Sequence, residues 1–194
     1  MNDQSTETTQ RYIITGGPGS GKTTLLRALE SAGYPCFDEV SREVIREQQQ
    51  SDNSDITPWG DLLSFADVVF ERMRYQLDES GRFRICFFDR AMPDIVAYLQ
   101  EAGLPVADRY LRYATPEFYH PTVLVTPPWE EIFVNDNERP ESYEKSVALY
   151  EALVETYTGL GFSLVTLPKT TVAERRKWVL NYYTPARSED LAGT

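Results

Sequence analysis

The sequence predicts an α/β fold in which helices flank a five-stranded parallel sheet. Five short apolar runs of strand length alternate with stretches whose apolar residues recur at helical spacing. A glycine-rich turn, "GGPGSGKTT", joins the first apolar run to the first helical stretch. With 194 residues, 41% of them hydrophobic, the chain can bury the core of one domain, or of one domain with a small lid.

The predicted strands share an apolar core and end at a polar residue, a proline or the glycine-rich turn. The third is almost continuously apolar ("FRICFFD"), which is typical of a parallel strand covered on both faces. The fourth is stopped by two prolines, which cannot donate to a sheet. In order, the five strands are residues 11–15, 34–38, 83–89, 121–128 and 162–168.

The predicted helices fill the segments between these strands. Gly33 and Gly103 follow two of them, as expected for residues that end a helix in the left-handed conformation. Thr171 and Glu174 form a capping box that opens the last one. The longest carries the apolar stripe Leu62, Phe65, Ala66, Val69, Met73 and Leu77, and a later one carries Tyr143, Val147, Tyr150, Val154 and Tyr157. The helices are expected at residues 21–33, 39–50, 62–81, 92–103, 143–157 and 171–183.

The glycine-rich turn fits the pattern G-x-x-x-x-G-K-[ST] without a gap, which predicts phosphate binding. Glycines let the backbone approach an anion closely, and the following helix adds the positive end of its dipole. Lys22 is expected to reach the β- and γ-phosphates and Thr23 to bind Mg²⁺. An ordinary glycine-rich turn is the alternative. The predicted phosphate-binding residues are Gly16, Gly17, Pro18, Gly19, Ser20, Gly21, Lys22, Thr23 and Thr24.

Charge and composition exclude several classes of partner. The formal net charge is −11 and no basic run occurs, which argues against nucleic acids and anionic membranes. No apolar stretch approaches 18 residues, and residues 1–10 lack the apolar region of a secretory signal. We expect a cytoplasmic protein with a disordered tail at 1–10 and a flexible tail at 184–194. Cys36 and Cys86 are expected to be buried free thiols, with a disulfide or metal pair as the alternative.

A second motif, "CFFDR", ends the third predicted strand with Asp89. There the carboxylate is expected to lie beside the glycine-rich turn and to hold Mg²⁺. Many strands end in an acid, so this motif is a weak signal by itself. It indicates a metal site only in combination with the glycine-rich turn. Motor ATPases usually carry Glu at the next position to activate water, whereas this chain has Arg90. Arg90 therefore favours transfer to a bound acceptor, which it would help to bind.

A third motif, "FDEVSRE", places Asp38 and Glu39 at the carboxyl end of the second predicted strand. Ligands bind at this edge in such folds. Glu39 could accept a proton from an acceptor hydroxyl or hydrogen-bond a ribose, and Arg42 would share its helix face. The alternative is a helix N-terminal acid with a surface ion pair.

A fourth segment, about residues 128–145, is the candidate lid. Arg139 is its one basic residue before Lys145 and could approach phosphate charge on closure, or else pair with neighbouring acids. His120 is expected to be structural. The tryptophans are expected in the core or in a groove wall, where one could stack on a base: they are Trp59, Trp129 and Trp178.

Together, these motifs, with "PDI", "AYL", "TPPW", "ERP" and "LPK…VAERRKWVL", resemble the small P-loop proteins labelled AAA-family ATPases. That family is akin to the kinase domain that phosphorylates nicotinamide riboside, and the resemblance covers residues 11–182. It implies a nucleoside-kinase-like sheet order 2-3-1-4-5 and the use of ATP with Mg²⁺. It also implies that Glu39 and Arg42 face the acceptor, Asp89 the metal and Arg139 the lid.

The sequence thus leads to two functional hypotheses. The first is an Mg·ATP-dependent phosphotransferase for a small hydroxyl-bearing, nucleoside-like metabolite, with Lys22, Glu39, Asp89 and Arg139 as catalytic residues. Either Glu39 or Asp89 would orient or deprotonate the acceptor, and Lys22 and Arg139 would neutralise the developing phosphate charge. The acceptor would be bound by Asp38, Glu39, Arg42 and Arg90. The second is a slow ATPase that acts as a nucleotide-dependent switch or binding module. A small metabolite should stimulate turnover in the first case, and a protein partner in the second.

Overall fold

The computed structural model describes residues 8–50, 55–134 and 142–183. Its sheet has five parallel strands in the order β2-β3-β1-β4-β5, which confirms the predicted order. Each strand overlaps the predicted one, although β2 to β5 are shorter than predicted, β2 most of all in proportion. The strands are β1 Gln10–Thr15, β2 Cys36–Phe37, β3 Ile85–Asp89, β4 Thr122–Val125 and β5 Ser163–Thr166.

The strand register brings three chain segments together at the carboxyl edge of the sheet. Ile14 of β1 lies opposite Asp89 on one side and Leu124 on the other. Since the glycine-rich turn begins directly after Thr15, the end of β3 adjoins that turn. The fold therefore places the glycine-rich turn and Asp89 side by side, as the sequence predicts.

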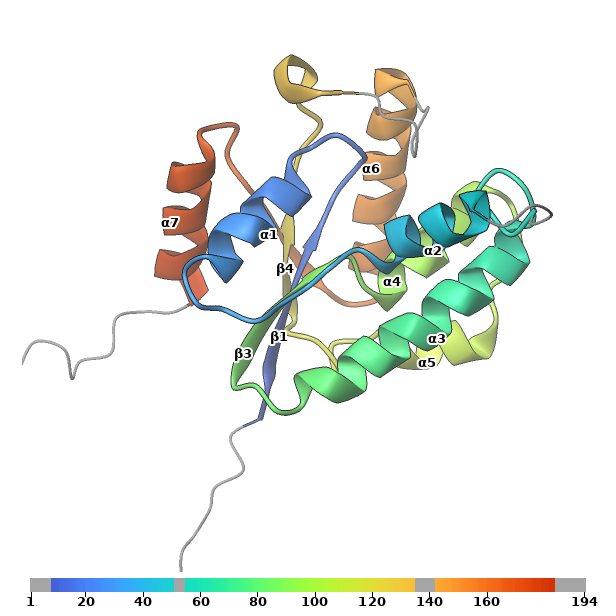
Figure 1. The fold of residues 1–194 in the computed structure, drawn as a ribbon, viewed down its shortest axis with the longest axis horizontal. Helices are drawn as coiled ribbons and strands as arrows, with labels where there is room; N and C mark the ends of the chain where they lie inside the picture. The colour runs from blue at the N-terminus through green and yellow to red at the C-terminus, as the bar shows by residue number, and fades with distance from the viewer. Residues whose placement is uncertain (1–7, 51–54, 135–141, 184–194) are drawn as a thin grey trace, which may run out of the picture.

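The helices cover the two faces of the sheet in separate layers (Figure 1). On one face lie α1 and α7, packed against Tyr12 and Ile14 of β1. On the other lie α2 to α6, packed against Ile13. This alternation follows from the two-residue period of a strand. The helices are α1 Lys22–Glu30, α2 Val40–Gln49, α3 Leu62–Ser80, α4 Met92–Glu101, α5 Asp108–Tyr113, α6 Tyr143–Gly159 and α7 Val172–Tyr183.

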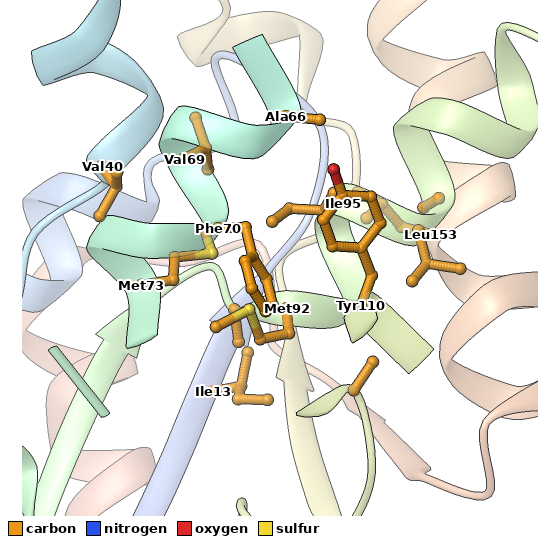
Figure 2. Close-up of a cluster of buried hydrophobic side chains, with 14 of the residues drawn as sticks. Ile13, Val40, Ala66, Val69, Phe70, Met73, Met92, Ile95, Tyr110 and Leu153 are labelled. Carbon is orange, nitrogen blue, oxygen red and sulfur yellow. The ribbon is translucent and has the colours of Figure 1, made fainter. Parts of the chain in front are cut away.

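The larger core gathers side chains from most of these elements. Figure 2 shows Ile13 of β1 below Phe70 and Met73 of α3, with Leu153 of α6 on the far side of Tyr110. Burying one such side chain contributes about 1.5–3 kcal/mol to the free energy of unfolding. This cluster holds α2, α3 and α4 as one layer beside the site described below.

Two helical features differ from the sequence prediction. In the α6 stripe only Tyr157 is fully buried, and the buried face instead carries Ser146, Leu149, Leu153, Thr156 and Tyr157. The face is displaced because Ser146 packs on the glycine-rich turn, where its hydroxyl donates to Pro18 O at 2.7 Å. The six-residue α5 and the 3₁₀ turn η1 (Glu130–Ile132) are too short for helical periodicity to predict.

The two cysteines and the histidine lie outside the candidate site. Cys36 and Cys86 are free thiols in β2 and β3, but only Cys86 is buried as expected, whereas Cys36 is partly buried. Burial raises the pKa of each to about 12. His120 precedes β4, at the opposite edge of the sheet, and packs against the rings of Tyr12 and Tyr183. Burial lowers the pKa of His120, which fits the structural role expected of it.

Candidate functional site

The glycine-rich turn between β1 and α1 depends on glycine at two positions, one where the backbone passes close to Thr126 and one where it is left-handed. Gly16 has φ +139°, and a Cβ there would lie 2.2 Å from Thr126 Oγ1 and 2.4 Å from Thr126 O. Gly21 caps α1 in the left-handed conformation, with φ +81°. Side chains at these positions would push the turn away from β4 or strain it. The motif glycines are therefore required by the path of the backbone.

Internal donors occupy the carbonyl oxygens of this turn. Lys22 Nζ donates to Gly16 O at 2.9 Å and to Gly17 O at 2.8 Å. Ser20 Oγ also donates to Gly17 O, at 2.7 Å. Because these hydrogen bonds neutralise oxygens that would repel an anion, the turn is prepared for a negatively charged ligand. The pocket beside it, which we call the phosphate pocket, is lined by Gly19, Ser20, Gly21, Lys22, Thr23, Thr24, Arg42, Ile132 and Val134.

Thr23 and Asp89 meet as the sequence predicts, with Thr23 Oγ1 donating to Asp89 Oδ2 at 2.9 Å. Asp89 is buried, and its Oδ1 has no hydrogen-bond partner among the described residues. Desolvation raises the pKa of Asp89, although the charges of Lys22 and Arg90 oppose that rise. A buried carboxylate oxygen without a donor is suited to a cation.

Hydroxyl and carboxylate oxygens are the ligands that Mg²⁺ prefers, so this pair fits the expected ion. Within residues 8–50, 55–134 and 142–183, no group of three or more His, Cys, Asp or Glu side chains is placed to hold a metal. A magnesium ion here would therefore take its other ligands from water and a nucleotide. Mg²⁺ commonly binds in this way.

A buried ion-pair network lies next to Asp89. Arg90 has φ +70°, a conformation that is rare outside glycine, and its side chain is buried. Its Nε donates to Glu39 Oε1 and its Nη1 to Asp94 Oδ1, each at 2.8 Å. Asp94 also accepts from Thr15 Oγ1 at 2.8 Å and from the Tyr157 hydroxyl at 2.6 Å. The network ties β1, α4 and α6 to the carboxylate of Glu39.

Sequence reasoning identified Glu39 and Arg90 but missed Asp94 and Tyr157. Asp94 falls in the first turn of α4, where an acid usually serves only the helix N-terminus. It does so here as well, since its Oδ2 accepts from Ala91 N at 3.0 Å. Tyr157 belonged to a predicted core stripe. Nothing in the sequence distinguished its hydroxyl from those of the other tyrosines.

Arg42 lies between the phosphate pocket and the Glu39 network. It lines the phosphate pocket, and its Nε lies 3.4 Å from Glu39 Oε2. Asp38, by contrast, accepts from Arg27 Nη2 at 2.8 Å on the surface and lines neither this pocket nor the one described next. The structure therefore brings Glu39, Arg42 and Arg90 together but not Asp38. Arg139 and much of the predicted lid lie outside the described residues.

A second pocket opens beside the network, between α2, α3 and α4, and we call it the acceptor pocket. Its volume is about 600 Å³, including the open mouth. Glu39, Arg90 and Asp94 form its polar end, and Trp59 lies in its wall with 53% of its surface exposed. The remaining lining residues are Ser41, Ile45, Pro58, Leu62, Phe65, Ala66, Val69, Met73, Ile95, Tyr98 and Leu99.

Arg175 of α7 is a further buried cation that the sequence did not single out. Its Nη1 donates to Ser20 O at 3.3 Å, and its guanidinium lies 5.9 Å from the centre of the Trp129 ring. Burial lowers the pKa of Arg175. This side chain supports the glycine-rich turn from the side of α7, so the last helix also contributes to the site.

Comparisons with known proteins agree with this geometry. A family model described as an AAA domain matches residues 11–175. A search of curated proteins found no match. None of the helices in the described part of the chain is long and apolar enough to cross a membrane.

Several solved structures share the fold at low sequence identity. A NadR protein in complex with NR is 20% identical, with a TM-score of 0.64, and the match covers 94% of this chain and 52% of that one. The chain thus spans about half the length of that NadR chain. Thymidylate kinase from Candida albicans is 16% identical, with a TM-score of 0.62 and coverage of 90% and 91%. Deoxyadenosine kinase from M. mycoides is 14% identical, with a TM-score of 0.59 and coverage of 89% and 98%. The chain therefore shares its fold with these proteins.

Proposed function

The chain belongs to the AAA domain family, and from this premise we propose that it is an Mg·ATP-dependent phosphotransferase acting on a small hydroxyl-bearing metabolite. One observation carries the proposal. Glu39 lines the acceptor pocket, and its second carboxylate oxygen lies 3.4 Å from Arg42, which lines the phosphate pocket. An ATPase that transfers phosphate to water does not need an apolar pocket at this place.

In this proposal, the phosphate pocket positions and neutralises the transferring group. Lys22 and Arg42 supply positive charge to the phosphates. Thr23 and Asp89 would hold Mg²⁺, which would neutralise charge on the phosphate oxygens. We further propose that Arg139 adds a cation from the lid. Catalysis would then rest mainly on positioning and electrostatic stabilisation.

Glu39 would act on the acceptor. Its carboxylate is held by Arg90 at Oε1, so the group has a fixed orientation at the polar end of the acceptor pocket. There it would orient the acceptor hydroxyl toward the phosphate pocket and accept its proton as the phosphoryl group is transferred. Two of the proteins that share this fold are a deoxyadenosine kinase and a thymidylate kinase, which supports a reaction of this class.

The experiment is a screen of metabolites for stimulated ADP release, followed by the variant Glu39→Gln. We expect a stimulating metabolite and a loss of about 10²–10⁴ in the acceptor-dependent rate, the usual contribution of a general base, with basal hydrolysis little changed. Glu43→Gln, exposed on the same helix, is the matched control and should behave as wild type. If no metabolite stimulates turnover and a protein partner does, the chain is a nucleotide-dependent switch instead.

A further inference from the structure

We infer that the acceptor carries no negative charge and presents a flat apolar ring beside its hydroxyl group. It would be a ring-bearing alcohol such as a nucleoside, and not a nucleotide or an organic acid. The inference rests on the proposed function, because it describes the occupant of the acceptor pocket. It follows from the charge and the shape of that pocket.

The charged side chains lining the acceptor pocket are two carboxylates, Glu39 and Asp94, and one guanidinium, Arg90. All three are buried, and Arg90 is the one cation of this lining and is shared by both carboxylates. Arg42, which lies 3.4 Å from Glu39, balances the second carboxylate from the side of the phosphate pocket. An anionic acceptor would lose its hydration beside two carboxylates and would meet only a lining cation that they already share. The pocket therefore disfavours phosphates and carboxylates on the acceptor.

Arg90 is not arranged to bind an anion. Its Nε and Nη1 are engaged by Glu39 and Asp94, so the two-pronged grip that arginine uses for phosphate or carboxylate is occupied. Its Nη2 is buried and has no hydrogen-bond partner among the described residues. Nη2 can therefore donate to a neutral oxygen, such as an acceptor hydroxyl, placed beside Glu39.

The rest of the acceptor pocket suits a flat apolar group. Its walls are formed mainly by α3 and α4, and Figure 2 shows Ala66 and Val69 of α3 near Ile95 of α4. Phe65 and Tyr98 add aromatic rings, while Trp59 leaves more than half of its surface exposed. Stacking between aromatic rings contributes about 0.5–1.5 kcal/mol beyond area burial.

The test uses matched ligand pairs that differ in one negative group: adenosine with AMP, thymidine with TMP, and hydroxymethylbenzene with hydroxymethylbenzoate. Binding to the full chain, in the presence of Mg²⁺ and a non-hydrolysable ATP analogue, is measured by calorimetry and by tryptophan fluorescence. We expect at least one uncharged member to bind at least about tenfold more tightly than its anionic partner. Trp59→Phe should remove the fluorescence change on binding.

A variant can reverse this preference without touching the buried network. Ser41 lines the acceptor pocket from the first turn of α2 and is partly exposed. Ser41→Arg adds a cation and should favour the anionic member of each pair, whereas Ser41→Gln, similar in length but uncharged, should not. This comparison separates charge from steric effects.

The outcomes distinguish this inference from the proposed function. Binding of an uncharged ring alcohol without phosphoryl transfer would leave the inference standing and count against the proposed function. Tight binding or phosphorylation of an anionic acceptor, or failure of every uncharged member to bind, would overturn the inference.

Discussion

Among single residues, substitution of Lys22 should have the clearest effect on nucleotide binding. The ammonium group of Lys22 holds Gly16 O and Gly17 O and lines the phosphate pocket. Hydrogen bonds to charged groups contribute about 1.5–3 kcal/mol, so Lys22→Ala should weaken ATP binding roughly 10- to 100-fold and abolish turnover. Calorimetric titration with ATP measures the affinity. Lys177→Ala, exposed on α7, should bind normally, and wild-type affinity in Lys22→Ala would refute the assignment of the phosphate pocket.

The substitution Asp89→Asn should raise the free energy of unfolding but weaken the binding of Mg²⁺. Since burial raises the pKa of Asp89, its ionised form destabilises the folded state once the pH exceeds its unfolded value of about 4. Without nucleotide, Asp89→Asn should therefore unfold at higher urea concentration at neutral pH. The gain should be about 1–3 kcal/mol, the cost of a buried unsatisfied group, and should shrink as the pH falls.

The same variant should lose the Mg²⁺ dependence of nucleotide binding, because Asn is a poorer magnesium ligand than carboxylate. A Mg²⁺ titration at fixed nucleotide concentration measures this. Asp78→Asn, exposed on α3, provides the matched control. A destabilised Asp89→Asn with an unchanged Mg²⁺ titration would make Asp89 a purely structural residue.

Between elements, the contact of α6 with α4 should matter for both stability and rate. The Tyr157 hydroxyl donates to Asp94, which in turn holds Arg90. Tyr157→Phe leaves one buried carboxylate oxygen with fewer donors and should lower the free energy of unfolding by about 1–3 kcal/mol. It should also lower the acceptor-dependent rate more than nucleotide affinity, because Arg90 orients Glu39.

Urea denaturation and steady-state kinetics test this prediction. Tyr75→Phe, on the exposed side of α3, removes a hydroxyl from solvent and should change neither quantity. Equal losses of nucleotide affinity and acceptor-dependent rate in Tyr157→Phe would indicate general loosening of the fold, and not the positioning of Glu39.

For the molecule as a whole, the net charge of −11 should make stability depend on salt. Raising ionic strength from about 0.01 to 0.15 M shortens the screening length from about 30 to 8 Å, which weakens repulsion between surface acids. The Tm of the nucleotide-free protein should therefore rise over this range. Calorimetry in potassium chloride measures it, and a falling Tm would show that surface ion pairs outweigh the repulsion.

Much of the fold could be predicted because its signals are local. The alternation of apolar runs and helical stripes, the glycine pattern and the capping residues act over a few positions, and they led to the five strands and to residues 16–24. The meeting of Thr23 with Asp89 was also predictable, since parallel strands end at one edge of the sheet. Short elements such as α5 lacked enough turns to show a period.

By itself, therefore, the sequence determined the P-loop, the parallel sheet and the residues at its carboxyl edge, because each depends on local geometry or on one repeated rule. The tertiary structure alone revealed the Asp94–Tyr157 contact, the support of Ser20 by Arg175 and the acceptor pocket. These join residues far apart in the chain, such as Tyr157 with Asp94 and Arg175 with Ser20. It also turned Asp38 toward Arg27 while burying the adjacent Glu39. Neighbouring acids have the same chemistry, and only the packing around them decides which one faces the site.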